Sequence, residues 1–478
     1  MAVSDGVDNA AVRTKVREMW DGTILESLSE LVAIPAVSAS FDQDWACSGH
    51  LDAAVEHARK WLASQHLPGA TIEVVRLPRR GPLLMVDVPA SDGAPDAGTV
   101  LLYGHLDKQP PVADWADGLD AWTPVVRDGR LYGRGAADDG YAGYASAAAI
   151  EAVAASGGSH GRCVLLLETG EESGSPDLPA YLEHLRPRLG EVTLVVCLDS
   201  GANDYDRMWL TTSLRGLVQV NLTVRVLDVA QHSGLASGIV PSSFRIARAL
   251  LERLEDAASG EVRLPDLHVG IPDDRAREVR ETVAAAPGSV RDGFPMVPGV
   301  HQVSDDEVEL TLNGSWRPTL SVTGADGLPA PADAGNVLRT HTTLCLSFRL
   351  PPTADSAQAL AAVRTALTTD VPYGARVELS GVESADGWNA PALAPWLAAA
   401  LDEVGATTFG QPWRTIGLGG SIPFMGLLHE SYPRAQFVIT GALGPQSNAH
   451  VPDESLHLDY AAKLTEAIAL LLDAHARR

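Results

Sequence analysis

The chain has 478 residues, 45% of them hydrophobic, and its 36 Lys and Arg against 61 Asp and Glu give a formal net charge of −25. A chain of this length and apolar content forms roughly two to four domains with large cores, so disorder over most of it is excluded. The strong negative charge also argues against a nucleic-acid-binding protein, which needs a basic face.

The first part of the chain alternates between strand and helix patterns. Apolar residues at helical spacing predict an amphipathic helix over residues 12–31, which stops before Pro35. The elements predicted next are strands at 71–77 and 83–88, a strand at 99–104, a helix at 141–155, a strand at 162–168, a helix at 178–189 and a strand at 192–198. This alternation is typical of an α/β domain with a mostly parallel sheet.

After Leu214 the pattern changes to that of a separate module. Its predicted elements are a strand at 217–226, a helix at 241–254, strands at 308–310 and 343–350, a helix at 356–367 and a strand at 375–381. This β-α-β-β-α-β order is the ferredoxin-like pattern. Residues 256–303 are rich in Pro, Gly and charged residues, so they are predicted to form a long irregular insertion.

The α/β pattern resumes beyond Trp388. A helix is predicted at 394–404, a strand at 435–440 and a final helix at 458–476. The simplest organisation is a discontinuous α/β domain formed by residues 1–212 and 385–478, with a ferredoxin-like α+β domain at 213–384 inserted into it.

Acidic and imidazole side chains follow the predicted strands, and ligands of open α/β sheets bind at the carboxyl ends of the strands. The positions are His105 with Asp107, Asp138 with Asp139, Glu171 with Glu172, Asp199, and His450. Each one alone is readily explained as a turn residue, a helix cap or a solvated histidine. Together, carboxylates at adjacent strand ends raise one another's pKa strongly unless cations compensate them. Oxygen and imidazole ligands without thiolates fit Zn²⁺, Mn²⁺ or another divalent ion.

The charge of this cluster favours two metal ions over one. Asp138, Glu172 and Asp199 as ligands, Glu171 as a base and a bridging hydroxide each carry one negative charge. Two divalent ions reduce this sum to a single negative charge, whereas one ion leaves the cluster far more negative.

The motifs HLDKQP, DGRLYGRGAADD, GEESGS, LRG, HSG and GGSIP occur in this order along the chain. They resemble the motifs of the M20 family of dinuclear metallopeptidases, and most of all its cytosolic nonspecific dipeptidase and carnosinase branch. The resemblance runs from about residue 15 to the C-terminus. It implies metal-dependent hydrolysis of the amide bond of dipeptides or similar small peptides by a metal-bridged hydroxide.

The resemblance also implies a role for each site residue. The implied metal ligands are His105 and Asp199 for one ion, Glu172 and His450 for the other, and Asp138 between the two. Asp107 would orient His105 on the metal, and Glu171 would be the general base that passes the proton of the water to the leaving nitrogen. His232 resembles the family histidine that stabilises the oxyanion.

Four further residues match family positions that bind the substrate, namely Arg349, Asn336, Gly420 and Ser421. Arg349 would pair with the C-terminal carboxylate of a dipeptide, although a salt bridge at a strand end is the ordinary alternative for such an arginine. Ser421 equally fits a helix N-cap before the residues IPF.

The chain departs from the family pattern at two places. Gly140-Tyr141 stands where the family commonly has Lys-Gly, and Leu418 stands where dipeptidases have a glutamate before Gly-Gly-Ser. The missing glutamate removes a carboxylate that would meet a free α-amino group. An amidohydrolase or deacylase acting on N-acyl or otherwise modified amino acids is therefore the alternative function.

Three other interpretations fit the sequence less well. Residues 157–161 match the G-x-S-x-G pattern of serine hydrolases, but a helix precedes them and a strand follows, which is the reverse of the required order. Gly133-Arg134-Gly135 resembles a dinucleotide-binding loop, yet Asp138 occupies its sixth position and would repel a pyrophosphate. A non-catalytic metal-binding scaffold would have little use for Glu171 beside Glu172.

The remaining expectations concern location and assembly. No stretch approaches ~18 consecutive uncharged apolar residues, so no membrane contact is expected. The four cysteines form no C-x-x-C pair, which is typical of a protein of the reducing cytoplasm. The resemblance further implies a homodimer formed through the inserted domain, which would act as a lid and bring His232 to the active site of the neighbouring subunit.

Overall fold

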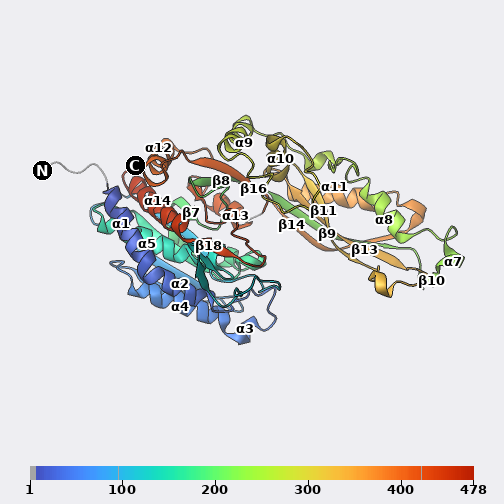
Figure 1. The fold of residues 1–478 in the computed structure, drawn as a ribbon, viewed down its shortest axis with the longest axis horizontal. Helices are drawn as coiled ribbons and strands as arrows, with labels where there is room; N and C mark the ends of the chain where they lie inside the picture. The colour runs from blue at the N-terminus through green and yellow to red at the C-terminus, as the bar shows by residue number, and fades with distance from the viewer. Residues whose placement is uncertain (1–6, 95, 421–422) are drawn as a thin grey trace. The chain divides into compact units, whose positions relative to one another are not determined.

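The computed structural model describes residues 7–94, 96–420 and 423–478, and the chain divides into two compact units (Figure 1). The first unit comprises the described residues up to Thr212 together with Ala390–Ile416 and Leu427–Arg478. The second comprises the described residues of Ser213–Asn389 and Gly417–Gly426. Across the part of the chain that is described, no helix combines the length and the apolar character needed to cross a bilayer.

The first unit is built on a six-stranded sheet with the order β1-β2-β6-β3-β7-β17. Its strands are β1 (Thr71–Val75), β2 (Leu83–Val88), β3 (Thr99–His105), β6 (Arg162–Glu168), β7 (Val192–Cys197) and β17 (Gln436–Ile439). β3 runs parallel to both β6 and β7, and β17 runs parallel to β7, whereas β2 is antiparallel to β1 and β6. The predicted α/β fold with a mostly parallel sheet is therefore confirmed.

Helices cover this sheet (Figure 1). The helices of the first unit are α1 (Asn9–Met19), α2 (Leu25–Val32), α3 (Trp45–Ser48), α4 (His50–Ser64), α5 (Ala142–Ala155), α6 (Leu178–Leu189), α12 (Pro395–Val404) and α14 (Leu458–Ala476). A further helix, α13 (Pro423–Ser431), begins in the second unit and ends in the first. The alanine-rich α5 packs directly on β3 and β6, and α14 packs on α5. Small side chains let α5 approach the sheet closely, so this helix is buried along most of its length.

The described residues form two further short sheets of three strands each. One has the order β18-β5-β4, formed by β4 (Val125–Arg127), β5 (Arg130–Tyr132) and β18 (Ser455–His457). The other has the order β15-β8-β16, formed by β8 (Trp209–Leu214), β15 (Trp388–Asn389) and β16 (Arg414–Leu418). The chain passes from one unit to the other within β8, directly after β15 and within β16. Most of these strands are too short to show an apolar alternation in the sequence.

The second unit contains a four-stranded antiparallel sheet with the order β11-β13-β9-β14. Its strands are β9 (Gly216–Arg225), β11 (Thr319–Asp326), β13 (His341–Leu350) and β14 (Arg376–Ala385), and α8 (Ser243–Leu251) and α11 (Ser356–Thr368) pack against it. Every second residue of β9 and β13 is buried, and these side chains form one core with the apolar faces of both helices. The period-two pattern in the sequence results from this one-sided burial.

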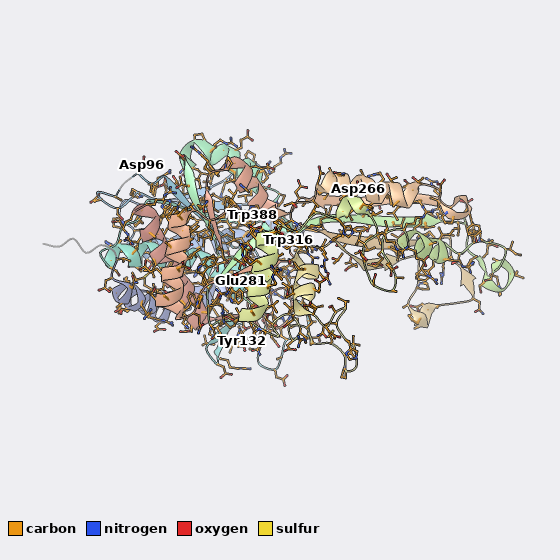
Figure 2. The ribbon with its side chains drawn as sticks, turned by 90° about the horizontal axis from the view of Figure 1, so that it is seen from above. Asp96, Tyr132, Asp266, Glu281, Trp316 and Trp388 are labelled. Atoms are coloured by element: carbon orange, nitrogen blue, oxygen red, sulfur yellow. The ribbon has the colours of Figure 1, made fainter. Side chains whose placement is uncertain are left out.

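The remaining elements of the second unit are β10 (Gln231–His232), α7 (Ser233–Ala236), α9 (Asp273–Ala285), α10 (Glu307–Ser315) and β12 (Val337–Leu338). β10 pairs with β12, and α9 packs against α10 through a small apolar cluster that includes Trp316, which is labelled in Figure 2. The insertion at 256–303 is thus not irregular throughout, because it contains α9.

The prediction of a strand at 308–310 is wrong. These residues lie in α10, where the carboxylate of Asp306 accepts a hydrogen bond from the backbone N–H of Val308 at 2.8 Å and caps the helix. The strand that occupies this place in the order is β11, at 319–326, which pairs with β13. Three residues of alternating character are too few to distinguish a strand from a turn of helix.

Phe348 tests the core of the second unit. Its ring is completely buried on β13, opposite Val218 of β9. Phe348→Ala should lower the free energy of unfolding of this unit by about 3–5 kcal/mol, measured from urea-induced unfolding. Val322→Ala on β11, where 47% of the residue is exposed, should cost less than about 1 kcal/mol, and equal losses would contradict this assignment of the core.

Candidate metal centre

Three of the five predicted metal ligands, His105, Glu172 and Asp199, lie at the carboxyl ends of three neighbouring strands. β3 ends at His105, Glu171 and Glu172 follow β6, and Asp199 follows β7. The Cα atom of His105 pairs with Glu168 of β6, and β3 also pairs with β7, so the three strand ends are adjacent. All of these residues belong to the first unit.

A first group of potential ligands consists of His105, Asp138 and Asp199, all of them buried. The Nε2 atom of His105 lies 3.5 Å from Oδ1 of Asp138 and 3.8 Å from Oδ2 of Asp199. The other ring nitrogen, Nδ1, lies 3.0 Å from the backbone carbonyl oxygen of Asp107, which places its proton there. Nε2 therefore points its lone pair at the two carboxylates and makes no hydrogen bond to a described residue.

A second group consists of Asp138, Glu172 and His450. The Nε2 atom of His450 lies 2.8 Å from Oδ2 of Asp138 and 3.3 Å from Oε2 of Glu172. His450 reaches this position from a loop and has a positive φ of 66°. Asp138 belongs to both groups, so its two oxygens can each face a different ion. The donors and the orphaned nitrogen of His105 fit two divalent ions such as Zn²⁺ or Mn²⁺.

Asp107 holds the segment that carries the two glutamates. Its buried carboxylate accepts hydrogen bonds from the backbone N–H groups of Glu171 at 3.2 Å and Glu172 at 3.1 Å. One of these oxygens also lies 3.5 Å from Nδ1 of His105. Gln109 donates a hydrogen bond to Oε2 of Glu172 at 2.7 Å. Asp107 therefore links one histidine of the cluster to the glutamate pair.

The pKa values show the cost of burying these acids together. Burial, followed by repulsion between the carboxylates, raises the pKa of Asp199 and Glu172 well above their usual range. Burial also raises the pKa of Glu171 to about 7. Burial acts in the same direction on Asp138, but its contacts with two histidines outweigh this effect and lower its pKa. Cations are what such a cluster needs to remain ionised at neutral pH.

A buried ion pair that sequence reasoning missed supports the segment around Asp138. Nη1 of Arg134 lies 2.7 Å from Oε2 of Glu454, and both side chains are almost completely buried. The other oxygen of Glu454 accepts hydrogen bonds from the backbone N–H groups of Gly135, Ala137 and Asp138. Glu454 follows His450 by four residues and Arg134 precedes Asp138 by four, so this pair joins the segments of two ligands.

Lys108 is a second buried charge beside the site. Its Nζ donates hydrogen bonds to the carbonyl oxygens of Leu31, Val32 and Ile34, at the carboxyl end of α2. Its stem lies against Gly135, where a Cβ atom would be 2.8 Å from the lysine chain and where φ is +77°. A side chain at Gly135 would therefore displace Lys108 or the loop.

The predicted substrate-binding residues that the structure describes belong to the second unit. His232 is exposed on β10, and its Nδ1 accepts a hydrogen bond from the backbone N–H of Gly234 at 3.0 Å. Asn336 lies beside it, since its carbonyl oxygen accepts a bond from the N–H of Ser233 at 2.9 Å. Arg349 lies on β13 and Gly420 is exposed after β16, while Ser421 falls outside the described residues.

Comparison with known proteins identifies a family and a fold. A model of the peptidase family M20/M25/M40 matches residues 101–474. A cysteinylglycine-S-conjugate dipeptidase from Corynebacterium striatum is 28% identical over 417 residues, which cover 84% of this chain and 86% of that protein. A Cys-Gly metallodipeptidase from Schizosaccharomyces pombe is 26% identical and covers 69% of each chain. The crystal structure of human carnosine dipeptidase 1 superposes with a TM-score of 0.78 at 22% identity, over 98% of this chain and 99% of the other.

Metal titration tests the two ligand groups. Chelated protein should bind two equivalents of Zn²⁺ or Mn²⁺ in calorimetry, and its melting temperature should rise on binding. Asp138→Asn should weaken both binding events, whereas Asp199→Asn should weaken only one, because only Asp138 belongs to both groups. Asp92→Asn, at an exposed position, is the matched control and should leave both unchanged. A single equivalent, or equal effects of the two variants, would contradict the assignment.

Glu454→Gln tests the buried ion pair. The substitution leaves the Arg134 charge buried without its carboxylate, so stability should fall by about 3–5 kcal/mol and the affinity for metal should fall with it. Glu191→Gln breaks an exposed pair with Arg434 and should cost less than about 1 kcal/mol. Thermal unfolding and metal titration of both variants measure the difference, and an equally mild result for Glu454→Gln would rule out the supporting role.

Proposed function

This chain belongs to the peptidase family M20/M25/M40, and from this premise we propose that it hydrolyses the amide bond of dipeptides or similar small peptides with the help of two divalent ions, Zn²⁺ or Mn²⁺. The observation that carries the proposal is the pair of ligand groups that share Asp138 at the carboxyl ends of β3, β6 and β7. Glu171, like Asp107 and Asp139, is an acidic neighbour that belongs to neither group. The two dipeptidases named above support the choice of a dipeptide as substrate.

In the proposed mechanism, the bound ions supply Lewis acidity, which polarises the scissile carbonyl and lowers the pKa of water. Glu171 takes a proton from the attacking water while the water oxygen forms a bond to the carbonyl carbon. Glu171 then gives this proton to the nitrogen as the C–N bond breaks, so that an acid and an amine are released. Asp107 positions Glu171 for both transfers, because it binds the backbone N–H of that residue.

The second unit is proposed to act on the substrate. By resemblance, His232 stabilises the oxyanion, while Arg349, Asn336, Gly420 and Ser421 bind the carboxylate end of the substrate. These roles are part of the proposal. They are supported by the finding that the described members of this set all belong to the second unit, namely His232, Arg349, Asn336 and Gly420.

We also propose that the protein is a homodimer formed through the second unit, with His232 serving the partner subunit. A surface patch supports this, composed of Val229, Leu235, Ile239 and Val337 around β10, α7 and β12. Leu235 and Ile239 are 77% and 81% exposed, and exposed apolar clusters of this kind mark interaction sites.

The alternative substrates, N-acyl or modified amino acids, are not favoured by these relatives. Leu418, which stands where dipeptidases have a glutamate, remains the residue that bears on this choice. A cytoplasmic location is proposed as well, and the four free cysteines of the chain are compatible with it.

Glu171→Gln tests the mechanism. The turnover of a free dipeptide by metal-loaded protein should fall by about 10²–10⁴-fold, because the proton carrier is lost. Metal stoichiometry and melting temperature should remain those of the wild type, while Glu172→Gln should lose metal as well as activity. Retained activity in Glu171→Gln would remove its role as base. A higher kcat/KM for N-acetylated than for free dipeptides would overturn the choice of substrate.

A further inference from the structure

Two arginines of the second unit lie close together on the same side of its sheet. Arg349 of β13 pairs across the sheet with Thr319, the first residue of β11. The Nη1 atom of Arg215, which directly precedes β9, donates a hydrogen bond to Oγ1 of this same Thr319 at 3.2 Å. Burial, followed by repulsion from Arg349, lowers the pKa of Arg215 to about 10. Their guanidinium groups are thus neighbours that repel each other.

Neither guanidinium has a carboxylate partner among the described residues. Arg215 bonds only neutral oxygens, those of Gly419 at 3.3 Å, Asn313 at 3.4 Å and Thr319. Arg349 forms no ion pair or hydrogen bond with the described residues, and burial lowers its pKa. Arg253 of the same unit also bonds only backbone carbonyl oxygens, at 2.6–3.0 Å. Arg215 and Arg349 differ from it because two such guanidinium groups lie next to each other.

Two other arginines of this unit pair with carboxylates. Arg317 also contacts Asn313, but it pairs with Glu309 at 2.6 Å. Arg275, which is buried, pairs with Glu278 at 2.8 Å. The absence of a carboxylate at Arg215 and Arg349 therefore points to an anion that comes from outside the chain, because partly buried charges are normally compensated.

We propose that Arg215 and Arg349 form one subsite for two carboxylates, and that the enzyme prefers dipeptides whose C-terminal residue is Asp or Glu. This inference rests on the proposed function and adds Arg215 to it as a specificity-determining residue. Arg349 binds the main-chain carboxylate and Arg215 binds the side-chain carboxylate. Arg349, which makes no hydrogen bond to the described residues, can bind its carboxylate through two parallel hydrogen bonds. Arg215 offers its Nη2 group to the second carboxylate, because its Nε and Nη1 atoms already bond to Gly419, Asn313 and Thr319. A substrate with one carboxylate leaves one of the two positive charges uncompensated.

The loop that follows β16 makes room for the Arg215 guanidinium. A Cβ atom at Gly419 would lie 2.9 Å from Nη2 of Arg215, so glycine allows the arginine to lie against the loop. The contacts of Arg215 with the carbonyl oxygens of Gly419 and Asn313 also give it a structural role. A purely structural role would affect all substrates equally, whereas a subsite affects only those with a second carboxylate.

The test compares the isosteric substrates Ala-Glu and Ala-Gln with metal-loaded protein at low ionic strength. The wild type should show at least about a tenfold higher kcat/KM for Ala-Glu, since a specific charged contact contributes at this scale. Arg215→Gln should reduce the ratio of kcat/KM for Ala-Glu to that for Ala-Gln to within about twofold of one. It should change kcat/KM for Ala-Gln little. Arg349→Gln should lower kcat/KM for both substrates. Arg317→Gln, the matched control, should leave the ratio unchanged.

Two results would overturn the inference. One is a wild-type kcat/KM for Ala-Glu that is no higher than that for Ala-Gln. The other is an equal loss for both substrates in Arg215→Gln, which would leave Arg215 with a structural role alone. If Arg215→Gln fails to fold, Arg215→Lys replaces it. The ratio of kcat/KM for Ala-Glu to that for Ala-Gln should then lie between the wild-type value and a value of one, because lysine keeps the charge but not the planar guanidinium geometry. An unchanged ratio in the lysine variant would also count against the subsite.

Failure of the proposed function has a different signature. In that case the metal-loaded wild type hydrolyses neither dipeptide. Calorimetric binding of Ala-Glu and Ala-Gln to Glu171→Gln protein still tests the subsite, because it measures the same preference without turnover. A preference in binding without hydrolysis would support the subsite and reject the peptidase activity, whereas hydrolysis without preference would do the reverse.

Discussion

Repulsion between buried carboxylates is the constraint on which the first unit depends. Asp138, Glu172 and Asp199 meet where three strands end, with the buried Asp107 close by. Such a cluster is stable only when opposite charge or hydrogen-bond donors surround it. The chain supplies two imidazoles and the backbone N–H groups that bind Asp107, and the donor set leaves the remaining compensation to cations.

The parallel sheet is what makes this concentration of charge possible. Parallel strands place their carboxyl ends at one edge, so residues as far apart in sequence as His105 and Asp199 become neighbours. The other ligands need separate supports. The ion pair of Arg134 with Glu454 supplies one, because it binds the backbone before Asp138 and lies in the segment that follows His450.

Two arginines of the second unit present the opposite electrostatic situation. The first unit concentrates acids that need cations, whereas Arg215 and Arg349 are cations without acids among the described residues. The proposed peptide substrate has the matching polarity, with a carbonyl for Lewis-acid activation and a carboxylate end for guanidinium binding. The proposed preference for a second carboxylate follows because two neighbouring positive charges are compensated only by two negative charges.

Local patterns in the sequence determined the strands of the central sheet and the acidic residues at their ends, since a buried strand needs a continuous apolar run and metal ligands need specific atoms. The order of the motifs determined the family. Tertiary structure alone decided that residues 308–310 form a helix, that Glu454 pairs with Arg134, and that Arg215 has no carboxylate partner among the described residues. The physical reason is that pairing depends on which distant segments the fold brings together, and a charged residue has the same local pattern whether or not its partner is present.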